Sequence, residues 1–328
     1  MLQAIVALPT AVIALLVVHQ PALACTGKLG VGRTVTIDTE GDPLHGGLQY
    51  KTASLLRDGE VVLTFDDGPL RSKTRRVLAA LKDHCTKGTF FMVGRMAVAD
   101  PSMVREVASA GHTIASHTWS HKNLKHRSAR RAMGEIELGI SAIQHALGKP
   151  VAPFFRFPYL SDTNAMIAYN KNRKIAMFSI DIDSYDYRTR SADRVHRTIM
   201  RQLASRKKGI ILFHDIQVST ARAMQRILDS LKAKKFKVVH IKAKTTIPTV
   251  SIYDAQAAEL HAKRRYSPSI RPVTGVAPSN FQETSSTALS DLDRPKRVVP
   301  KRRRVRKRAS PVRKRRESWA DTFWKSAD

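Results

Sequence analysis

Between Val61 and Ile241 the chain alternates short apolar segments of strand length with longer segments that carry apolar residues at helical spacing. Strand–helix alternation of this length implies parallel strands joined by right-handed crossovers. The seven expected strands are Val61–Phe65, Thr89–Val93, Thr113–Ser116, Pro153–Phe155, Ala176–Ile180, Ile210–Phe213 and Val238–Ile241. The expected helices are Lys73–Asp83, Ser102–Ala110, Ser128–Leu147, Asn164–Asn170, Ala192–Ala204 and Thr220–Lys234. Two α/β architectures remain open, an incomplete (β/α) barrel and an open doubly wound sheet.

Composition excludes several classes of protein and locates the charge. Hydrophobic residues make up 42% of the 328 residues and charged residues 26%, which excludes a wholly disordered, a collagen-like or a multi-span membrane chain. The net charge is +30, and residues 294–316 alone carry 14 Lys and Arg and no acid. Removing these 14 leaves 43 Lys and Arg against 27 Asp and Glu, a net charge of +16. The body of the chain is therefore basic even without this segment.

Residues 1–24 are predicted to be an export signal, because the apolar run Ala4–Val18 is followed by the small residues Ala22 and Ala24. No Lys or Arg precedes the run, so an uncleaved anchor stays open, as does a lipoprotein modified at Cys25. We expect an exported protein that is periplasmic, secreted or associated with the cell envelope. Cleavage after Ala24 would start the mature chain at Cys25, which could pair with Cys85 in an oxidising compartment. The alternative is two unrelated thiols.

The segments that flank the alternating region differ from it in composition. Residues 25–60 are expected to be an N-terminal extension, and residues 244–293, rich in Thr, Ser, Pro and Ala, a disordered linker. Residues 294–328 form a basic tail that ends in Trp319, Phe323 and Trp324. An export signal disfavours nucleic acid as the partner of this tail and favours an anionic wall polymer or membrane surface. The alternative is a solvated, disordered tail.

Chemically capable side chains follow five of the predicted strands. They are Asp66 and Asp67, His117 with His121, Arg156, Asp181 with Asp183 and Asp186, and His214. The carboxyl ends of parallel barrel strands open on one face, where active sites are built. Each segment alone has a simpler reading: Asp-Asp-Gly-Pro makes a good turn, and two histidines four apart would share one face of a helical turn without binding anything. Their joint occurrence, each after its own strand, predicts a shared site.

These residue types fit a metal-dependent hydrolase. Two imidazoles and one carboxylate can hold a divalent metal and leave positions open for water and substrate. The metal lowers the pKa of its water and polarises a carbonyl group. A second carboxylate can accept a proton from that water, and a further histidine can protonate the leaving group. The pair Asp66 and Asp67 can supply both carboxylates, and His214 is the histidine outside the ligand pair.

The chain resembles the polysaccharide deacetylases of carbohydrate esterase family 4, which contain the NodB homology domain. Its five motifs occur here in order, at Thr64–Gly68, His117–His121, Arg156–Tyr159, Asp183–Tyr187 and Leu212–His214. The resemblance covers about Val61 to Ile241 and implies a deformed (β/α) barrel of about seven parallel strands in residues 61–243. One departure is Tyr187, which stands where the family commonly has tryptophan.

The resemblance also implies a role for each motif residue. The metal, Zn²⁺ or another divalent ion such as Co²⁺, would be bound by Asp67, His117 and His121. The catalytic base would be Asp66, held by Arg156, and the general acid would be His214, oriented by Asp186. The oxyanion and substrate-binding surface would comprise Tyr159 (through its backbone N–H), Pro158, Leu212 and Tyr187.

The implied reaction hydrolyses an N-acetyl group on an amino sugar and releases acetate. The implied substrate is a chito-oligosaccharide or peptidoglycan N-acetylglucosamine. The alternatives are an O-acetyl esterase, a non-catalytic glycan-binding module, and a metal-independent amidohydrolase on the same barrel. The sequence gives no indication of an oligomeric state.

Overall fold

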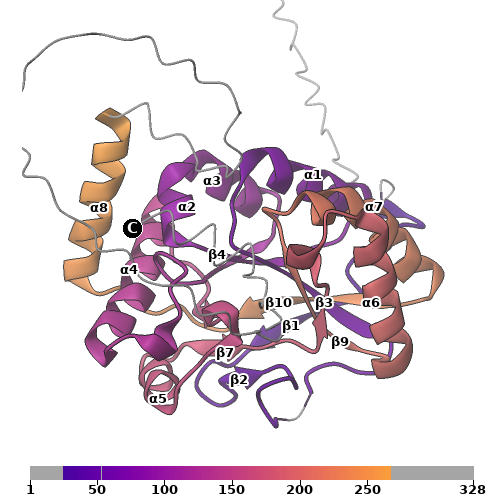
Figure 1. Ribbon diagram of the computed structural model, residues 1–328, viewed down its shortest axis with the longest axis horizontal. Coiled ribbons are helices and arrows are strands. Elements are labelled where there is room, and N and C mark those ends of the chain that lie inside the picture. The colour runs from indigo at the N-terminus through magenta and orange to yellow at the C-terminus, as the bar shows by residue number, and fades with distance from the viewer. Residues whose placement is uncertain (1–24, 53, 267–328) are drawn as a thin grey trace, which may run out of the picture.

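The computed structural model describes residues 25–52 and 54–266, which contain ten strands in one parallel sheet (Figure 1). The strands are β1 (Arg33–Ile37), β2 (Leu44–His45), β3 (Glu60–Asp66), β4 (Thr89–Met92), β5 (Thr113–Ser116), β6 (Phe154–Phe155), β7 (Ala176–Phe178), β8 (Ile182–Asp183), β9 (Gly209–His214) and β10 (Lys237–Ala243). The helices are α1 (Arg71–Asp83), α2 (Gly94–Ala99), α3 (Pro101–Ser109), α4 (Ala129–Leu147), α5 (Asn164–Asn172), α6 (Ala192–Arg206), α7 (Val218–Ala233) and α8 (Ser251–Tyr266). All seven expected strands and all six expected helices are present.

The strands form a deformed barrel, as expected. β3 pairs with β4 on one side and with β9 on the other, and the sheet continues from β4 through β5 and β6 to β7. The chain then passes from Phe178 to β8, which pairs with β9, so the circuit of strands returns to β3. This closure excludes the open doubly wound sheet. β1 and β2 come from the N-terminal extension and add to β10 and β7.

Alternation along the fully buried β3 separates two apolar layers. Val61, Leu63 and Phe65 pack into the large cluster that includes the covering helices. Val62 belongs to the second cluster, with Phe91, Ala115, Phe154, Phe178 and Ile210 from neighbouring strands. Because side chains alternate between the faces of a strand, Asp66 projects into the barrel on the same side as Val62 and Thr64. The apolar interior thus ends in a carboxylate at the carboxyl end of β3.

Helix α8 corrects the prediction of a disordered linker from residue 244. It packs on α4 and α2 at the outer edge of the molecule, on the opposite side from α6 and α7 (Figure 1). Ala257 is completely buried against Val98, Leu138 and Ala142, and the ring of His261 lies 3.0 Å from the Ala142 carbonyl oxygen. Among residues 251–264 of this helix only Ala257 and His261 are buried, and Tyr253 and Leu260 pack beside them partly exposed, so no strong apolar periodicity marked this helix.

The folded domain therefore continues to Tyr266, beyond the expected boundary at residue 243. The predicted export signal, the rest of the linker and the basic tail lie outside the described residues. Among residues 25–52 and 54–266, the structure has no helix long and apolar enough to span a membrane.

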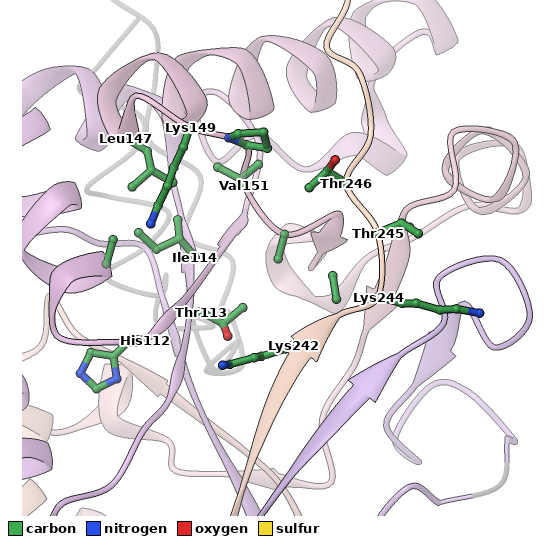
Figure 2. A pocket seen from close by; sticks show the side chains of 14 residues that line it. His112, Thr113, Ile114, Leu147, Lys149, Val151, Lys242, Lys244, Thr245 and Thr246 are labelled. Atoms are coloured by element: carbon green, nitrogen blue, oxygen red, sulfur yellow. The ribbon is translucent and has the colours of Figure 1, made fainter. Parts of the chain in front are cut away.

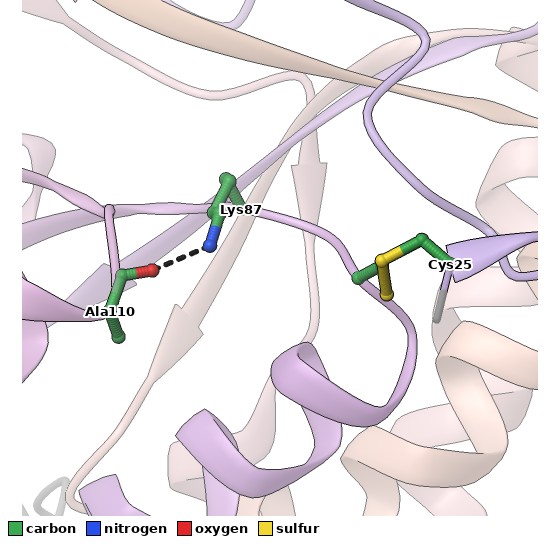
Figure 3. Close-up of a disulfide and its surroundings, with 4 residues drawn as sticks. Cys25, Lys87 and Ala110 are labelled. Atoms are coloured by element: carbon green, nitrogen blue, oxygen red, sulfur yellow. Dashed lines mark hydrogen bonds between the residues drawn. A yellow bond between two sulfur atoms is a disulfide. The ribbon is translucent and has the colours of Figure 1, made fainter. Parts of the chain in front are cut away.

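Cys25 and Cys85 form a disulfide (Figure 3). Of the two alternatives left open by the sequence, the paired one is therefore confirmed. The bond ties the segment before β1 to the turn after α1 and closes a loop across 60 positions of sequence. On the chain-entropy account, such a crosslink stabilises by restricting the unfolded chain, by ~2–4 kcal/mol. We expect the double variant Cys25→Ser, Cys85→Ser to lose about this much free energy of unfolding in urea titrations. An unchanged unfolding midpoint would show that the disulfide contributes nothing to stability.

Candidate metal and acid–base site

The carboxyl ends of four strands bring the predicted site residues together. Asp66 is the last residue of β3 and His214 the last of β9, and the two are register partners on adjacent strands. His117 directly follows β5, and Arg156 directly follows β6. All four are mostly or completely buried, so four of the five segments converge at one end of the barrel as the sequence predicted.

Asp67, His117 and His121 form a cluster whose candidate ligand atoms all lie within 4.8 Å of one another. Oδ1 of Asp67 is 3.2 Å from Nε2 of His121 and 3.6 Å from Nε2 of His117. Nδ1 of His117 donates to the Arg156 carbonyl oxygen at 2.7 Å. That bond fixes the tautomer in which Nε2 of His117 presents a lone pair to the cluster.

The chemistry of the cluster fits a divalent cation. Oδ1 of Asp67 is buried and accepts no hydrogen bond. Burial raises the pKa of Asp67 to about 7, lowers that of His117 to about 3 and lowers that of His121 well below its usual range. Both imidazoles are therefore neutral, which is the form that binds metal, and the carboxylate lacks a compensating charge. A cation held by these three residues supplies that charge.

The two histidines are brought together by a loop, not by the helical turn that their spacing suggested. Thr118 and His121 both have left-handed backbone conformations, with φ of 71° and 58°. The backbone N–H of His121 donates to the Thr118 hydroxyl, and Glu135 of α4 accepts from the N–H and the hydroxyl of Ser120. The loop is thus fixed to α4 through Glu135, which the sequence did not single out.

Asp66 lies beside the cluster and is held by Arg156. Nη1 of Arg156 donates to Oδ1 of Asp66 at 2.7 Å and to the Thr64 hydroxyl at 2.8 Å. The guanidinium is completely buried, donates to the carbonyl oxygens of residues 178 and 179, and stacks over the ring of Phe91. Burial raises the pKa of Asp66, and the Arg156 charge opposes this rise. Oδ2 of Asp66 remains 3.8 Å from Nε2 of His117, on the side of the cluster.

His214 and Asp186 form a second buried pair. Nδ1 of His214 donates to Oδ1 of Asp186 at 2.7 Å, and the His214 backbone N–H donates to Oδ2 at 2.7 Å. The Thr220 hydroxyl at the start of α7 also donates to this carboxylate. Burial alone would lower the pKa of His214, but the charge and hydrogen bond of Asp186, together with the charges of Asp67 and Asp66, outweigh it and raise the pKa to about 10. His214 is therefore an imidazolium at neutral pH.

The expected oxyanion and substrate residues surround these groups. Tyr159 has a left-handed backbone with φ of 60°, and its half-exposed ring meets that of His121 edge-on at 4.8 Å. Pro158 and Leu212 are buried, and the ring of Tyr187 lies 5.4 Å from that of His214. The residues of the family motifs thus lie at this end of the barrel, while their individual roles stay predictions. Asp181, which the sequence grouped with them, lies instead beside the amino end of β9, where its carboxylate accepts from the backbone N–H groups of Gly47 and Ile210.

Asp215 and Gly68 are part of the same structure and were not predicted. Oδ2 of the completely buried Asp215 accepts from the Thr74 hydroxyl at 2.5 Å, which links β9 to α1. A Cβ atom on Gly68 would lie 2.3 Å from both oxygens of this carboxylate. The close approach explains why glycine follows the two aspartates, and only the tertiary packing of β9 against this turn reveals it.

A hollow of about 660 Å³ lies elsewhere, beside the starts of β5 and β6 rather than at their carboxyl ends (Figure 2). Lys149, Lys242 and Thr113 line it together with apolar residues. It contains none of the predicted site residues.

Comparison with known proteins finds a matching family profile and several similar proteins. The family profile described as polysaccharide deacetylase matches residues 55–178. A chitooligosaccharide deacetylase of Azorhizobium caulinodans is 33% identical over 156 residues, which are 47% of this chain and 73% of that protein. A peptidoglycan-N-acetylglucosamine deacetylase of Listeria monocytogenes is 32% identical over 182 residues, or 55% of this chain. The chain spans 38% of the length of that Listeria relative.

Solved structures share the fold. A peptidoglycan deacetylase of Bdellovibrio bacteriovorus superposes with a TM-score of 0.59 at 31% identity, over 65% of this chain and 59% of that one. A Bacillus anthracis protein described as a pseudoenzyme of carbohydrate esterase family 4 also superposes, with a TM-score of 0.52 at 22% identity, over 56% of this chain and 63% of that one. Because a pseudoenzyme has this fold, the fold alone does not assign turnover. The matching profile, the Azorhizobium relative and the order of the motifs place the chain in the polysaccharide deacetylase family, carbohydrate esterase family 4.

Proposed function

We propose that this protein is a metal-dependent hydrolase that removes N-acetyl groups from the amino sugars of a glycan and releases acetate. The observation that carries the proposal is the buried cluster of Asp67, His117 and His121, flanked by a carboxylate held by Arg156 and an imidazolium held by Asp186. The relatives named above act on peptidoglycan N-acetylglucosamine or chitooligosaccharide, and we propose the same substrate classes here.

Asp67, His117 and His121 would bind the metal, for which we propose Zn²⁺, with another divalent ion such as Co²⁺ as the alternative. The bound ion would supply Lewis acidity and lower the pKa of a water molecule. Asp66 is placed to accept a proton from that water, because Arg156 occupies its Oδ1 and leaves Oδ2 on the cluster side. The buried Arg156 guanidinium orients Asp66 and favours its ionised form against the effect of burial, and a general base needs that form.

His214 would complete the reaction as the general acid. Attack of water oxygen on the acetyl carbon forms a C–O bond, and cleavage of the C–N bond leaves an amine that needs a proton. His214 carries that proton at neutral pH because Asp186 stabilises the imidazolium. The products are acetate and the free amino sugar. The backbone N–H of Tyr159 would stabilise the oxyanion, and Pro158, Leu212 and Tyr187 would shape the pocket around the acetyl group and the sugar.

The disulfide supports the proposal that the protein is exported, because such bonds persist in oxidising compartments. A periplasmic, secreted or envelope-associated enzyme would meet peptidoglycan directly. Binding of the basic tail to an anionic wall polymer or membrane surface remains a separate proposal. A truncation that removes only the tail has to fall after Tyr266, because α8 belongs to the domain.

Mass spectrometry of glycans incubated with the purified protein tests the proposed function. We expect chito-oligosaccharides or muropeptides to lose acetyl groups, and we expect a chelator to abolish the loss and added Zn²⁺ to restore it. Activity that persists after complete metal removal would contradict the metal dependence. An O-acetylated glycan in the same experiment distinguishes the esterase alternative, since only that substrate would then react. Absence of any mass change with metal bound would favour the non-catalytic glycan-binding module.

A further inference from the structure

Arg188 is a cation at the rim of the site that the proposed reaction does not use. It ends the short turn Asp186–Arg188, which begins with the carboxylate that holds His214. The guanidinium carbon lies 4.9 Å from the centre of the Tyr185 ring and 5.3 Å from that of Tyr187. The residue is exposed, so its charge faces solvent beside the site.

The two tyrosines fix the position of Arg188 relative to the reacting groups. The ring of Tyr187 lies 5.4 Å from the ring of His214, and its centre lies 5.3 Å from the guanidinium carbon of Arg188. The Tyr187 hydroxyl and the Tyr185 backbone N–H both donate to the carboxylate of Asp183, and the Arg188 backbone N–H donates to the Tyr185 carbonyl oxygen. A guanidinium stacked on aromatic rings loses little conformational freedom when it binds a ligand.

Arg188 differs from the other charges of the site because it has no counter-ion within the described part of the chain. Asp66 is paired with Arg156, and Asp186 with His214. No carboxylate among residues 25–52 and 54–266 forms an ion pair with Arg188, and Asp183 bonds the two tyrosines instead. The planar donors of an arginine match a carboxylate bidentately. The position of this cation next to the acid therefore suits a carboxylate carried by the substrate near the sugar that is deacetylated.

We propose that Arg188, held by Tyr185 and Tyr187, forms a carboxylate-binding subsite beside the active site. This inference rests on the proposed function, because it names the substrate class that the same site prefers. Among N-acetylated glycans, peptidoglycan carries carboxylates on its lactyl groups and on its peptides, whereas chito-oligosaccharides are neutral. The subsite thus selects peptidoglycan fragments over neutral oligomers of the same length.

The test compares Arg188→Gln with Arg190→Gln, which removes another exposed charge two residues along the chain. Three ligands separate the sources of charge: neutral chito-oligosaccharide, glycan strands stripped of peptide that keep a free lactyl carboxylate, and muropeptides that keep the peptide. We expect Arg188→Gln to raise KM for one or both charged ligands by about fivefold to tenfold with little change in kcat. KM for the neutral oligomer should stay within about twofold. Arg188→Lys should restore part of the difference, because it keeps the charge and loses the fork geometry.

Binding measured by calorimetry in the Asp66→Asn background gives a second readout that needs no turnover. If the binding preference for charged ligands depends on Arg188 while the unmodified protein releases no acetate, the subsite stands and the proposed function fails. Equal effects of Arg188→Gln on charged and neutral ligands, or an equal effect of Arg190→Gln, would overturn the subsite. A mass change in the deacetylation experiment would still support the proposed function, because that experiment does not depend on Arg188.

Discussion

Asp66→Asn is expected to lower kcat for deacetylation by about 10²–10⁴-fold, the range for loss of a general base. The amide cannot accept the proton from water, yet it matches the carboxylate in shape and can still accept the hydrogen bond from Arg156. The metal cluster uses Asp67, His117 and His121, so metal binding should persist. Steady-state kinetics combined with measurement of the bound metal checks both statements on the same sample.

Removing the Asp66 charge also leaves the buried Arg156 guanidinium without its counter-ion, which can cost ~3–5 kcal/mol of stability. Asp66→Glu is therefore the companion variant, because it keeps the charge and displaces the carboxylate. A folded Asp66→Glu protein with bound metal and strongly reduced kcat would support the role of Asp66 as base. Asp58→Asn, which removes an exposed carboxylate paired with Lys208, serves as the matched control and should keep full activity. Activity of both Asp66 variants within about threefold of the parent would contradict the assignment.

The position of Asp66 shows which features of the fold can be predicted from the sequence. Alternation along Val61–Phe65 predicted a buried strand, and the polar residues after five strands predicted a common face, because parallel strands all end on the same side of a barrel. These inferences depend only on local pattern and strand direction. The elements that the pattern missed are short or weakly apolar. β8 has two residues, and within residues 251–264 of α8 only Ala257 and His261 are buried.

The interactions that tune the site depend on contacts between distant segments, and no local pattern encodes them. The motif order identified Arg156, but only the fold shows that its guanidinium is completely buried between the strands. His117 and His121 were correctly paired for a partly wrong reason, since a loop fixed by Glu135 replaces the expected helical turn. Thr220, which helps to hold Asp186, lies at the start of α7, 34 positions away in sequence.

Asp186→Asn is expected to lower kcat at neutral pH by about 10²–10⁴-fold, because His214 would lose its proton. Burial lowers the pKa of His214, and the charge and hydrogen bond of Asp186, with smaller contributions from Asp67 and Asp66, raise it to about 10. In the variant only the smaller contributions of Asp67 and Asp66 oppose burial, and we expect the imidazole to become neutral at pH 7. In the pH profile of kcat/KM, the activity of the parent protein should fall on the alkaline side near pH 10. In the variant this alkaline limb should lie more than one pH unit lower. Asp193→Asn, which removes an exposed charge paired with Arg226, should leave the limb in place.

The raised pKa of His214 also determines how the stability of the folded protein changes with pH. The pKa of His214 is higher in the folded protein than the ordinary 6.5, so the folded state binds the proton more tightly. The resulting stabilisation is fully present below about pH 6.5 and is lost as the pH rises towards 10. Asp186→Asn should therefore lose more free energy of unfolding at pH 6 than at pH 10, measured against the parent by urea titration at both values. An equal loss at the two pH values, together with an unmoved alkaline limb, would show that Asp186 only holds the turn in place and does not set the charge of His214.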